Sequence, residues 1–279
     1  MTKKNSSTEP PARKPTKDKV EETPFEAVAS ICSVLVVGVF ILTFLAQNYL
    51  IPSGSMENTL LIGDHLVVDR ISLAPQSKWM PLVHYREPRR GDITVFMKPV
   101  FQPGIDAPDA DGQPQHTILV KRLIGVPGDH IRLHNGIVSI NGVAQPQPKD
   151  SSDVPVSEID QQYLDEFPSI PAAQCPSGGE AESWAIEEPK YLVNGELVVP
   201  PGMYFMMGDN RHDSLDSRFW GFVPRQNIMG RTLFNYWSFK ATDAQMEQTG
   251  FMQNLAWMAH VAKHFFSDTR WSRTFHVTR

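Results

Sequence analysis

Residues 27–46 constrain this chain most, because all twenty lack a charged side chain. As a helix this stretch would be about 30 Å long, which is the hydrocarbon thickness of a bilayer. A cleavable secretory signal would have a shorter apolar core and small residues at −3 and −1, whereas a cut after Ala46 would place Phe44 at −3. A buried core helix would show a polar stripe. We therefore predict a membrane-spanning anchor at residues 25–48.

The segment before this stretch fixes the expected orientation. Residues 1–24 contain six Lys or Arg and four Asp or Glu, with several Pro, Ser and Thr, so we predict a disordered tail there. Positive charge before a membrane segment favours a cytoplasmic N-terminus. Everything after Gln47 is then expected outside the cytoplasm.

Composition excludes several classes of protein. The net charge of −5 and the pI near 6.0 argue against nucleic-acid binding. Cys32 and Cys175 lie in an apolar run and a distant polar segment, so we expect no disulfide between them. Neither a CxxC nor an HExxH pattern occurs, and we predict no metal site.

Short apolar runs between turn residues predict a mainly β domain at residues 49–240. Asn135-Gly136 and Asn194-Gly195 are hairpin signals between such runs. The expected strands lie at residues 65–69, 93–96, 116–125, 131–133, 137–140, 191–193, 196–199, 203–207 and 228–239.

Two segments fall outside this pattern. Residues 145–190 are expected to form an insertion, partly disordered or a small lobe, because ten carboxylates and no Lys or Arg lie between residues 150 and 188. Residues 241–279 are expected to form an amphipathic helical tail. It either lies on a bilayer surface or covers the β domain. Its predicted apolar face consists of Phe251, Leu255, Met258, Ala259, Ala262 and Phe266.

Three stretches carry residues suited to chemistry. The first is Ile51–Leu60, where Gly54 permits a tight turn beside Ser55, although an ordinary linker has the same composition. The second surrounds Lys121 in a strongly apolar strand. Desolvation there would favour the neutral amine, which can accept a proton from a serine, unless the side chain snorkels to the surface.

The third stretch is residues 208–221, which is dense in turn formers, charges and hydroxyls. Asp216 and Arg218 are close enough in sequence to pair. A polar surface loop is the simpler reading, but Phe219 and Trp220 indicate partial burial. Buried polar groups need partners, so the composition favours an organised network.

Together these stretches resemble bacterial type I signal peptidases. The matching motifs are Ser-Gly-Ser-Met at residues 53–56, Lys-Arg at 121–122 followed by Gly-Val-Pro-Gly-Asp at 125–129, and the Gly-Asp-Asn-Arg stretch that begins at 208. Arg90-Gly91-Asp92-Ile93 also matches a short family motif. The resemblance covers roughly residues 49–143 and 197–239, and it leaves the insertion and the C-terminal tail outside.

The resemblance implies roles for individual residues. Ser55 is the expected nucleophile and Lys121 the general base, while the Ser55 N–H and the Ser53 hydroxyl form an oxyanion hole. Ser214 is expected to orient the lysine. Structural support is expected from Asp209, Asp216 and Arg218, and substrate pockets are expected to be lined by Tyr49, Ile51, Met56, Leu60 and Val120.

The family reading also implies partners and location. The chain is expected to cleave secretory preproteins after Ala-x-Ala sites at the outer face of a bacterial inner membrane, as a monomer without a cofactor. Two departures from the family pattern are Asn58, where a Pro is usual, and His212-Asp213, where Asp-Asn is usual. Alternative readings are a self-cleaving LexA-like serine–lysine protein and a non-catalytic membrane-anchored binding domain.

Overall fold

The computed structural model describes residues 23–41, 45–74, 85–99, 117–148, 158–174, 182–246 and 250–278. The chain divides into two units, residues 1–40 and residues 41–279.

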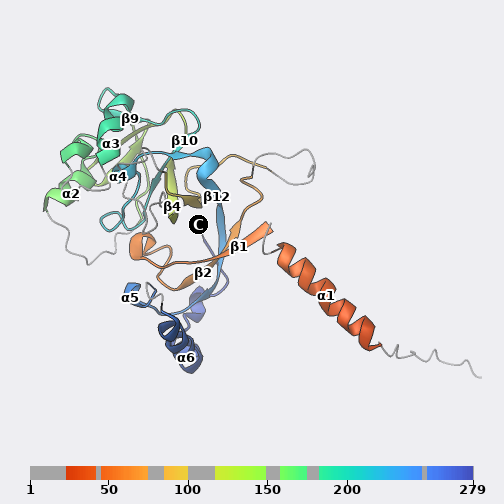
Figure 1. The fold of residues 1–279 in the computed structure, drawn as a ribbon. Coiled ribbons are helices and arrows are strands. Elements are labelled where there is room, and N and C mark those ends of the chain that lie inside the picture. The colour runs from red at the N-terminus through yellow and green to blue at the C-terminus, as the bar shows by residue number, and fades with distance from the viewer. Residues whose placement is uncertain are drawn as a thin grey trace, which may run out of the picture. The chain divides into compact units, whose positions relative to one another are not determined.

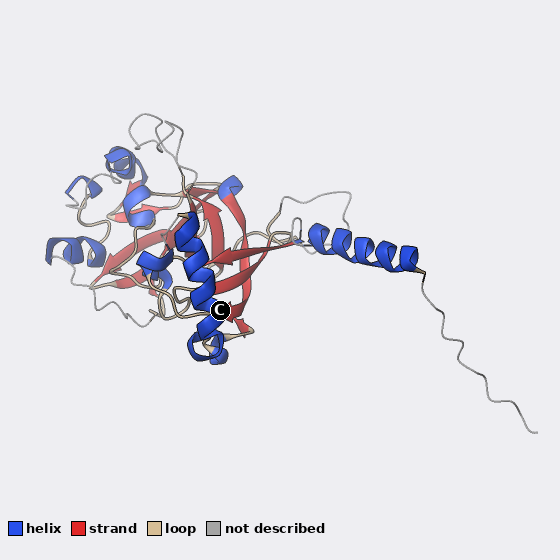
Figure 2. Ribbon diagram, turned by 60° about the horizontal axis from the view of Figure 1, so that its bottom comes forward, coloured by secondary structure: helices blue, strands red, loops and turns tan. Residues whose placement is uncertain are grey.

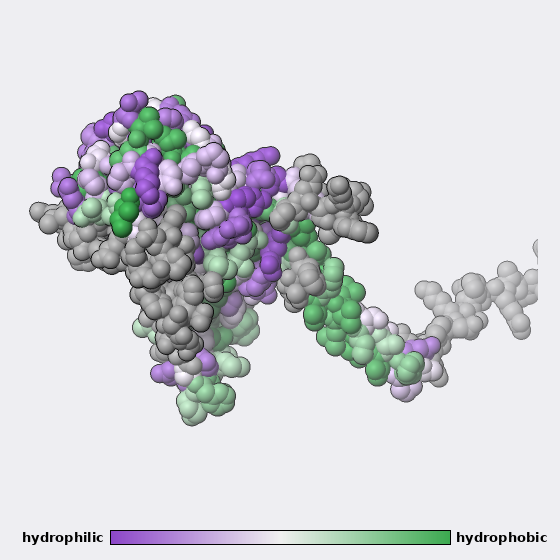
Figure 3. Space-filling view, turned by 45° about the horizontal axis from the view of Figure 1, so that its top comes forward, coloured by the Kyte–Doolittle hydropathy of each residue, from purple (hydrophilic) through white to green (hydrophobic). Residues whose placement is uncertain are grey.

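Helix α1, Pro24–Phe40, is the described element of the first unit. The Thr23 N–H donates to Glu26 Oε2 at 2.8 Å, and the Glu26 N–H donates to Thr23 Oγ1 at 3.3 Å. This reciprocal pair satisfies two amides that a helix start leaves free. No residue of α1 is buried, and its surface is hydrophobic over most of its length (Figure 3).

Judged by length and hydropathy together, none of the helices within the described ranges qualifies as a membrane-spanning helix.

The predicted helical anchor is too long at its C-terminal end. Helix α1 ends at Phe40, and Ala46–Leu50 forms strand β1. The reason is pairing: β1 lies antiparallel to β2, Asp64–Asp69, with Ala46 opposite Asp69. The backbone groups of β1 therefore find partners in the sheet ladder rather than in a helix.

The second unit contains a large antiparallel sheet with the order β1-β2-β12-β3-β4-β10-β11, and β13 also pairs with β12. Its further strands are β3 Ile93–Met97, β4 Ile118–Gly125, β10 Met203–Met207, β11 Val223–Pro224, β12 Ile228–Ser238 and β13 His276–Val277. Figure 1 shows β12 running along β2 in the middle of this unit. The central strand β12 thus lies between β2 and β3, with which it pairs on its two sides.

A smaller antiparallel sheet has the order β7-β6-β5-β9-β8. Its strands are β5 His130–His134, β6 Ile137–Ile140, β7 Val143–Ala144, β8 Leu192–Val193 and β9 Glu196–Val198. Asn135 and Asn194 each adopt a positive φ before a glycine that does the same. Two consecutive positive φ values are what a tight two-residue hairpin requires. The prediction of a mainly β domain is confirmed.

Helices lie around the outside of these strands (Figure 2). The described part of the acidic insertion contains α2, Glu158–Asp165, and α3, Glu182–Glu187. The other helices of this unit are α4 Ser217–Trp220, α5 Asp243–Met246 and α6 Phe251–Asp268. Glu188 closes the insertion, because its Oε2 accepts from the Ala172 N–H at 2.8 Å.

Two hydrophobic clusters hold the second unit together. The larger one joins the two sheets to α2 and α3 through buried rings, among them Trp184, Phe205 and Phe222. The smaller one comprises Ile51, Met56, Leu60, Leu66 and Ile93, with Val120 packed against it. This second cluster lies beneath the connection between β1 and β2, which carries Ser55, and fixes the position of that connection relative to β3 and β4.

Candidate active site

The serine turn, residues 51–62, connects β1 to β2 and contains the 3₁₀ turn η2, Gly54–Met56. Its base is closed by two backbone hydrogen bonds: the Ile51 N–H donates to the Asp64 carbonyl at 2.9 Å, and the Gly63 N–H donates to the Ile51 carbonyl at 3.0 Å. Met56 is buried below the turn. Ser55 is half-buried and Ser53 is exposed.

The loop at residues 208–216 packs directly on this turn. The Asn210 N–H donates to the Ser55 carbonyl, and the Asn210 side-chain amide donates to the Gly54 carbonyl, each at 3.2 Å. A Cβ at Gly208 would collide with the Ser214 hydroxyl and lie 2.5 Å from the Ser55 carbonyl oxygen. Only glycine therefore allows the loop to approach the serine turn this closely.

Lys121 lies on β4, paired with Thr94 of β3, and its side chain is 3% exposed. Strand β4, which carries Lys121, contacts η2, which carries Ser55. Burial lowers the pKa of the Lys121 ammonium to about 8, although the nearby Asp216 carboxylate acts in the opposite direction. The lysine does not snorkel to the surface, so the structure favours the functional reading of this residue.

Ser214 contributes a second hydroxyl to the interior of the site. Its Oγ is buried and makes no hydrogen bond to any described residue. The same oxygen lies against Gly208, beside the Ser55 carbonyl. A buried hydroxyl without a partner is rare in folded proteins and is common where a ligand or a reacting group is to be bound.

Asp216 and Arg218 form a fully buried pair at 0% and 1% exposure. Arg218 donates to both carboxylate oxygens at 2.9 Å, and Asp216 Oδ2 also accepts from the Gly208 N–H at 3.0 Å. Burial alone would raise the pKa of Asp216, but Arg218 holds it below its usual value. The pair thus fixes the loop that contacts Ser55.

The far side of Arg218 is held by the acidic insertion. Arg218 donates to the Arg211 carbonyl at 2.6 Å and to the Leu164 carbonyl of α2 at 3.3 Å. The Tyr163 hydroxyl donates to the Arg218 carbonyl at 2.5 Å. These contacts attach α2 to the wall of the site.

Asp209 connects three segments of the site through one carboxylate. Arg122 donates to both of its oxygens at 2.7 Å, and the Thr59 hydroxyl donates to Oδ2 at 2.5 Å. Arg122 also donates to the Gly91 carbonyl at 2.9 Å. Because Lys121 and Arg122 project to opposite faces of β4, one face supplies the candidate base and the other ties the loop to the serine turn.

The two departures from the family pattern have structural consequences. Asn58 has φ of 77°, a conformation that the proline ring cannot adopt, so the serine turn ends differently from a turn with Pro at this position. His212 lies 3.0 Å from Asp165 of α2, which links the loop to the insertion.

The predicted pocket residues separate into two groups. Ile51, Met56 and Leu60 are at most 3% exposed and belong to the smaller hydrophobic cluster. Tyr49 and Val120 are half-buried and reach the surface. The first three therefore shape the floor beneath the serine turn rather than an open wall. Within the described ranges, no group of three His, Cys, Asp or Glu side chains is arranged to bind a metal ion.

Sequence reasoning missed three side chains that assemble the site. Asn210, Thr59 and Arg122 fix the serine turn to the loop and to β4. All three stand inside or beside the motifs, but nothing in the sequence reveals which of the polar residues contact each other. A signal was present for Asn210, since an amide between Asp209 and Arg211 in a buried loop needs partners.

Comparison with known proteins finds similar chains among signal peptidases. A probable signal peptidase I-2 of Synechocystis sp. is 31% identical over 217 residues, covering 78% of this chain and 75% of that protein. Signal peptidase I of Leptolyngbya laminosa is 31% identical over 229 residues, covering 82% and 87%. A crystal structure of a signal peptidase I from Enterococcus faecalis is 29% identical, with a TM-score of 0.27, and covers 52% of this chain and 97% of that chain.

The match to a protein family includes all the elements of the candidate site. Residues 25–237 match the family described as signal peptidase, peptidase S26. This range contains the serine turn, β4 with Lys121, and the loop at residues 208–216. The resemblance predicted from the motifs is confirmed, and the chain belongs to the signal peptidase family, peptidase S26.

Proposed function

We propose that this chain is a serine endopeptidase that removes signal peptides from secretory preproteins, with Ser55 as nucleophile and Lys121 as general base. The observation that carries the proposal is the buried Lys121 with a pKa near 8 on a strand that contacts the serine turn. A lysine in bulk water is protonated at neutral pH, whereas one with this pKa supplies a useful fraction of free amine. Family membership supports the reaction and the substrate class.

The reaction needs no group beyond these side chains and water. Ser55 Oγ forms a bond to the scissile carbonyl carbon while its proton moves to the neutral Nζ of Lys121. The carbon–nitrogen bond then breaks, and the Lys121 ammonium returns the proton to the leaving amine. Water attacks the resulting ester, gives a proton to Lys121, and releases the acid as Ser55 recovers its hydroxyl proton.

The developing oxyanion is proposed to bind the Ser55 N–H and the Ser53 hydroxyl. Each such donor is worth roughly 3 kcal/mol of barrier. The unpartnered Ser214 hydroxyl is proposed to orient the Lys121 amine. Asp209, Asp216 and Arg218 are proposed to position the loop without touching the substrate.

Specificity is proposed to come from shallow apolar pockets beside the serine turn. Tyr49 and Val120 would contact the substrate, and Ile51, Met56 and Leu60 would limit the depth available to its side chains. Because these buried side chains already fill the space beneath the pockets, only small residues such as the alanines of an Ala-x-Ala site would fit.

The proposed location is the outer face of a bacterial inner membrane, with the N-terminus in the cytoplasm. The apolar segment that includes α1 would be the anchor, a proposal supported by its uncharged sequence and unburied side chains. Membrane association is typical of the family. An anchored domain of this kind would meet signal peptides as they leave the membrane.

The proposal is tested by cleavage of a preprotein with an Ala-x-Ala site by the detergent-solubilised full chain. Wild type is expected to cut after the second alanine, and Ser55→Ala is expected to lose cleavage by several orders of magnitude. Ser169→Ala is the matched control, since Ser169 is exposed in the insertion. An inert wild type, or a Ser55→Ala variant that keeps wild-type activity, would contradict the proposal. Either result would favour the alternative of a non-catalytic binding domain.

The pH dependence gives an independent prediction. Only the neutral amine of Lys121 accepts a proton, and its pKa is about 8. We therefore expect kcat/KM to rise with pH as the lysine loses its proton, with a half-maximum near that pKa, and then to level off. Initial rates between pH 6 and pH 10 on a preprotein without titrating groups at the cut would show this. A profile that is flat or falls through this range contradicts the assignment of the base.

A further inference from the structure

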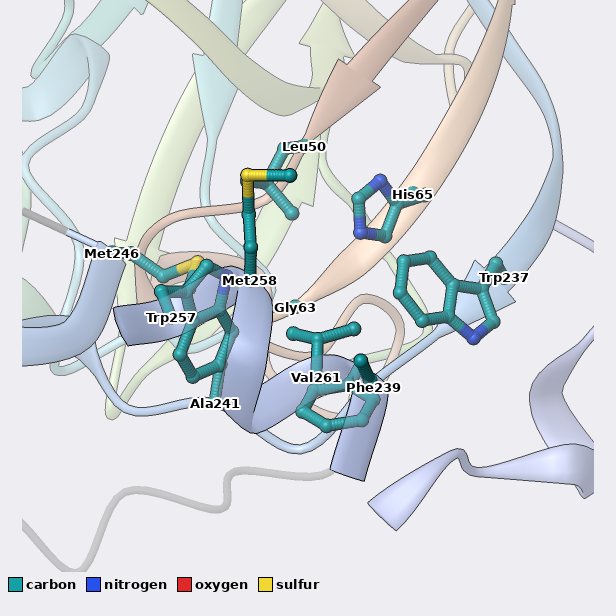
Figure 4. A pocket seen from close by; sticks show the side chains of 11 residues that line it. Leu50, Gly63, His65, Trp237, Phe239, Ala241, Met246, Trp257, Met258 and Val261 are labelled. Atoms are coloured by element: carbon teal, nitrogen blue, oxygen red, sulfur yellow. The ribbon is translucent and has the colours of Figure 1, made fainter. Parts of the chain in front are cut away.

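Two cavities of the second unit differ in the charge of their walls. The first, of about 320 Å³, lies where Trp257 and Val261 of α6 face Leu50 and His65 (Figure 4). Among the described residues, no Lys, Arg, Asp or Glu lines it. The second, of about 420 Å³, is lined by three arginines, which are Arg90, Arg122 and Arg211. The second cavity, called here the arginine cavity, is therefore the one suited to a charged ligand.

Two of the three arginines already have carboxylate partners. Arg90 Nε donates to Asp129 Oδ2 at 2.7 Å, and Arg122 donates to both oxygens of Asp209 at 2.7 Å. Neither of these carboxylates lines the arginine cavity, and no other Asp or Glu in the described part of the chain lines it. The charged side chains in its described wall are therefore all positive.

Arg211 is the arginine without a carboxylate partner. Its Nε donates to the Gly208 carbonyl at 3.0 Å and its Nη1 donates to Gln147 Oε1 at 2.6 Å, but it forms no ion pair with a described Asp or Glu. The side chain is only 8% exposed. Burial and the nearby Arg218 guanidinium lower its pKa to about 10, although Asp216 acts in the opposite direction, so Arg211 is charged at neutral pH. A buried charge with neutral partners keeps a desolvation cost that an anion would offset.

The rest of the wall is mostly apolar. Four aliphatic side chains of β4 and β6, each at most 8% exposed, line the arginine cavity: Leu123, Ile124, Val138 and Ile140. Pro146 and Pro148 add to this apolar part. A cavity of this volume, with an apolar wall and a few charged groups, has the character of a site for a small organic ligand.

We propose that the arginine cavity binds a carboxylate carried on an apolar body, with Arg211 as its main partner. The planar guanidinium suits the two oxygens of a carboxylate, and the apolar body lies against β4 and β6. An inorganic anion would leave the apolar wall uncovered, and a neutral apolar molecule would leave Arg211 without an opposite charge. Two sources carry this chemistry: a peptide that ends in an apolar residue, and a small free organic acid.

The arginine cavity is separate from the proposed catalytic pair but is connected to the loop beside it. Neither Ser55 nor Lys121 lines it, whereas Thr59 of the serine turn does. Arg211 directly follows Asn210, whose N–H donates to the Ser55 carbonyl at 3.2 Å. A bound carboxylate should therefore stabilise the loop at residues 208–216 without touching the proposed substrate.

The test is calorimetric titration of the detergent-solubilised full chain with hexanoate at pH 7 and low ionic strength, with the heat of titration into detergent alone subtracted. Hexanol carries the same apolar body without the charge, and inorganic phosphate carries charge without the apolar body. Hexanoate is expected to bind at least several-fold more tightly than either. Arg211→Gln should weaken hexanoate binding about 10- to 100-fold, the usual contribution of a hydrogen bond to a charged group. Arg132→Gln, at an exposed arginine of β5 outside the cavity, is the matched control and should bind as wild type does.

A second titration separates the two sources. Acetyl-Gly-Gly-Leu with a free C-terminus is compared with the same peptide as its C-terminal amide. Tighter binding of the peptide acid than of hexanoate, with no binding of the amide, identifies a peptide as the source. Tighter binding of hexanoate identifies a free organic acid, and both results support the proposal.

The proposal would be overturned if hexanoate and the peptide acid bind wild type no more tightly than phosphate and hexanol do. Equal hexanoate affinity in wild type and folded Arg211→Gln would also overturn it. Arg211→Lys keeps the charge without the planar fork, so its affinity should fall between the two, and it replaces Arg211→Gln if that variant does not fold. Hexanoate should raise the midpoint of thermal unfolding of wild type and of Arg132→Gln but not of Arg211→Gln. The same binding is expected in Ser55→Ala, so loss of peptidase activity and loss of carboxylate binding are separate results.

Discussion

Replacing Lys121 with methionine is expected to lower kcat for preprotein cleavage by roughly 10²- to 10⁴-fold, the usual contribution of a general base. Methionine keeps the unbranched, apolar stem of the lysine but has no group that accepts a proton from Ser55. The site is 3% exposed, so no solvent amine or water chain readily replaces it. Single-turnover cleavage of an Ala-x-Ala preprotein at pH 8.5 would measure the loss.

The Lys121→Met protein is expected to stay folded. Burial disfavours the ammonium of Lys121, which is why its pKa is lowered, and methionine removes that penalty. The midpoint of thermal unfolding should therefore equal or exceed that of wild type at pH 7. Lys190→Met, at a lysine whose side chain is 60% exposed, is the control for loss of a positive charge. If the folded Lys121→Met variant keeps more than a tenth of wild-type activity, Lys121 is not the general base.

Replacing Arg218 with methionine is expected to destabilise the fold by about 3–5 kcal/mol, because it leaves the Asp216 carboxylate buried without its partner. Asp216 is fully buried, so water cannot take the place of the guanidinium. Arg218 also donates to the carbonyls of Arg211 and Leu164, which would lose their partner. Urea unfolding followed by tryptophan fluorescence would measure the change.

The same variant should alter the pH profile of whatever activity remains. Asp216 favours the charged form of Lys121 and Arg218 opposes it, so removing Arg218 should raise the pKa of the lysine. We expect the rise of kcat/KM to move to higher pH. Lys190→Met breaks the exposed pair with Glu187 and should cost less than about 1 kcal/mol. If Arg218→Met and Lys190→Met lower the free energy of unfolding by similar amounts, burial of the Asp216–Arg218 pair is not the cause of the destabilisation.

The sequence predicted those parts of the fold that depend on local pattern. Short apolar runs between turn residues predict β2, β3, β4 and β10, and Asn-Gly pairs predict two hairpins, because a tight turn needs residues that tolerate positive φ. The motifs predict Ser55, Lys121 and Ser214 as site residues, and the structure brings β4 and the loop at residues 208–216 to the serine turn.

Other parts depend on contacts between distant segments. The sequence predicts a helix where β1 begins, because Ala46 continues an uncharged run and its pairing with Asp69 leaves no local signal. The sequence also gives no signal for the exposure of the apolar face of α6. A helical pattern locates an apolar face but does not say which face meets the sheet. For the same reason the sequence could not show that Asn210 donates to Gly54, 156 positions away.

Because α2 is attached to Arg218 and His212, the length of the insertion that contains α2 should vary little among relatives that keep these contacts. Surface insertions are ordinarily tolerated at small cost, because closing a longer loop costs little extra entropy. This one is different, since Tyr163 and Leu164 form hydrogen bonds with Arg218 of α4, and Asp165 contacts His212 of the loop that packs on the serine turn. A shortened relative of this chain would need another segment to occupy that wall, so gain or loss of the insertion should occur together with substitutions at the positions of Arg218 and His212.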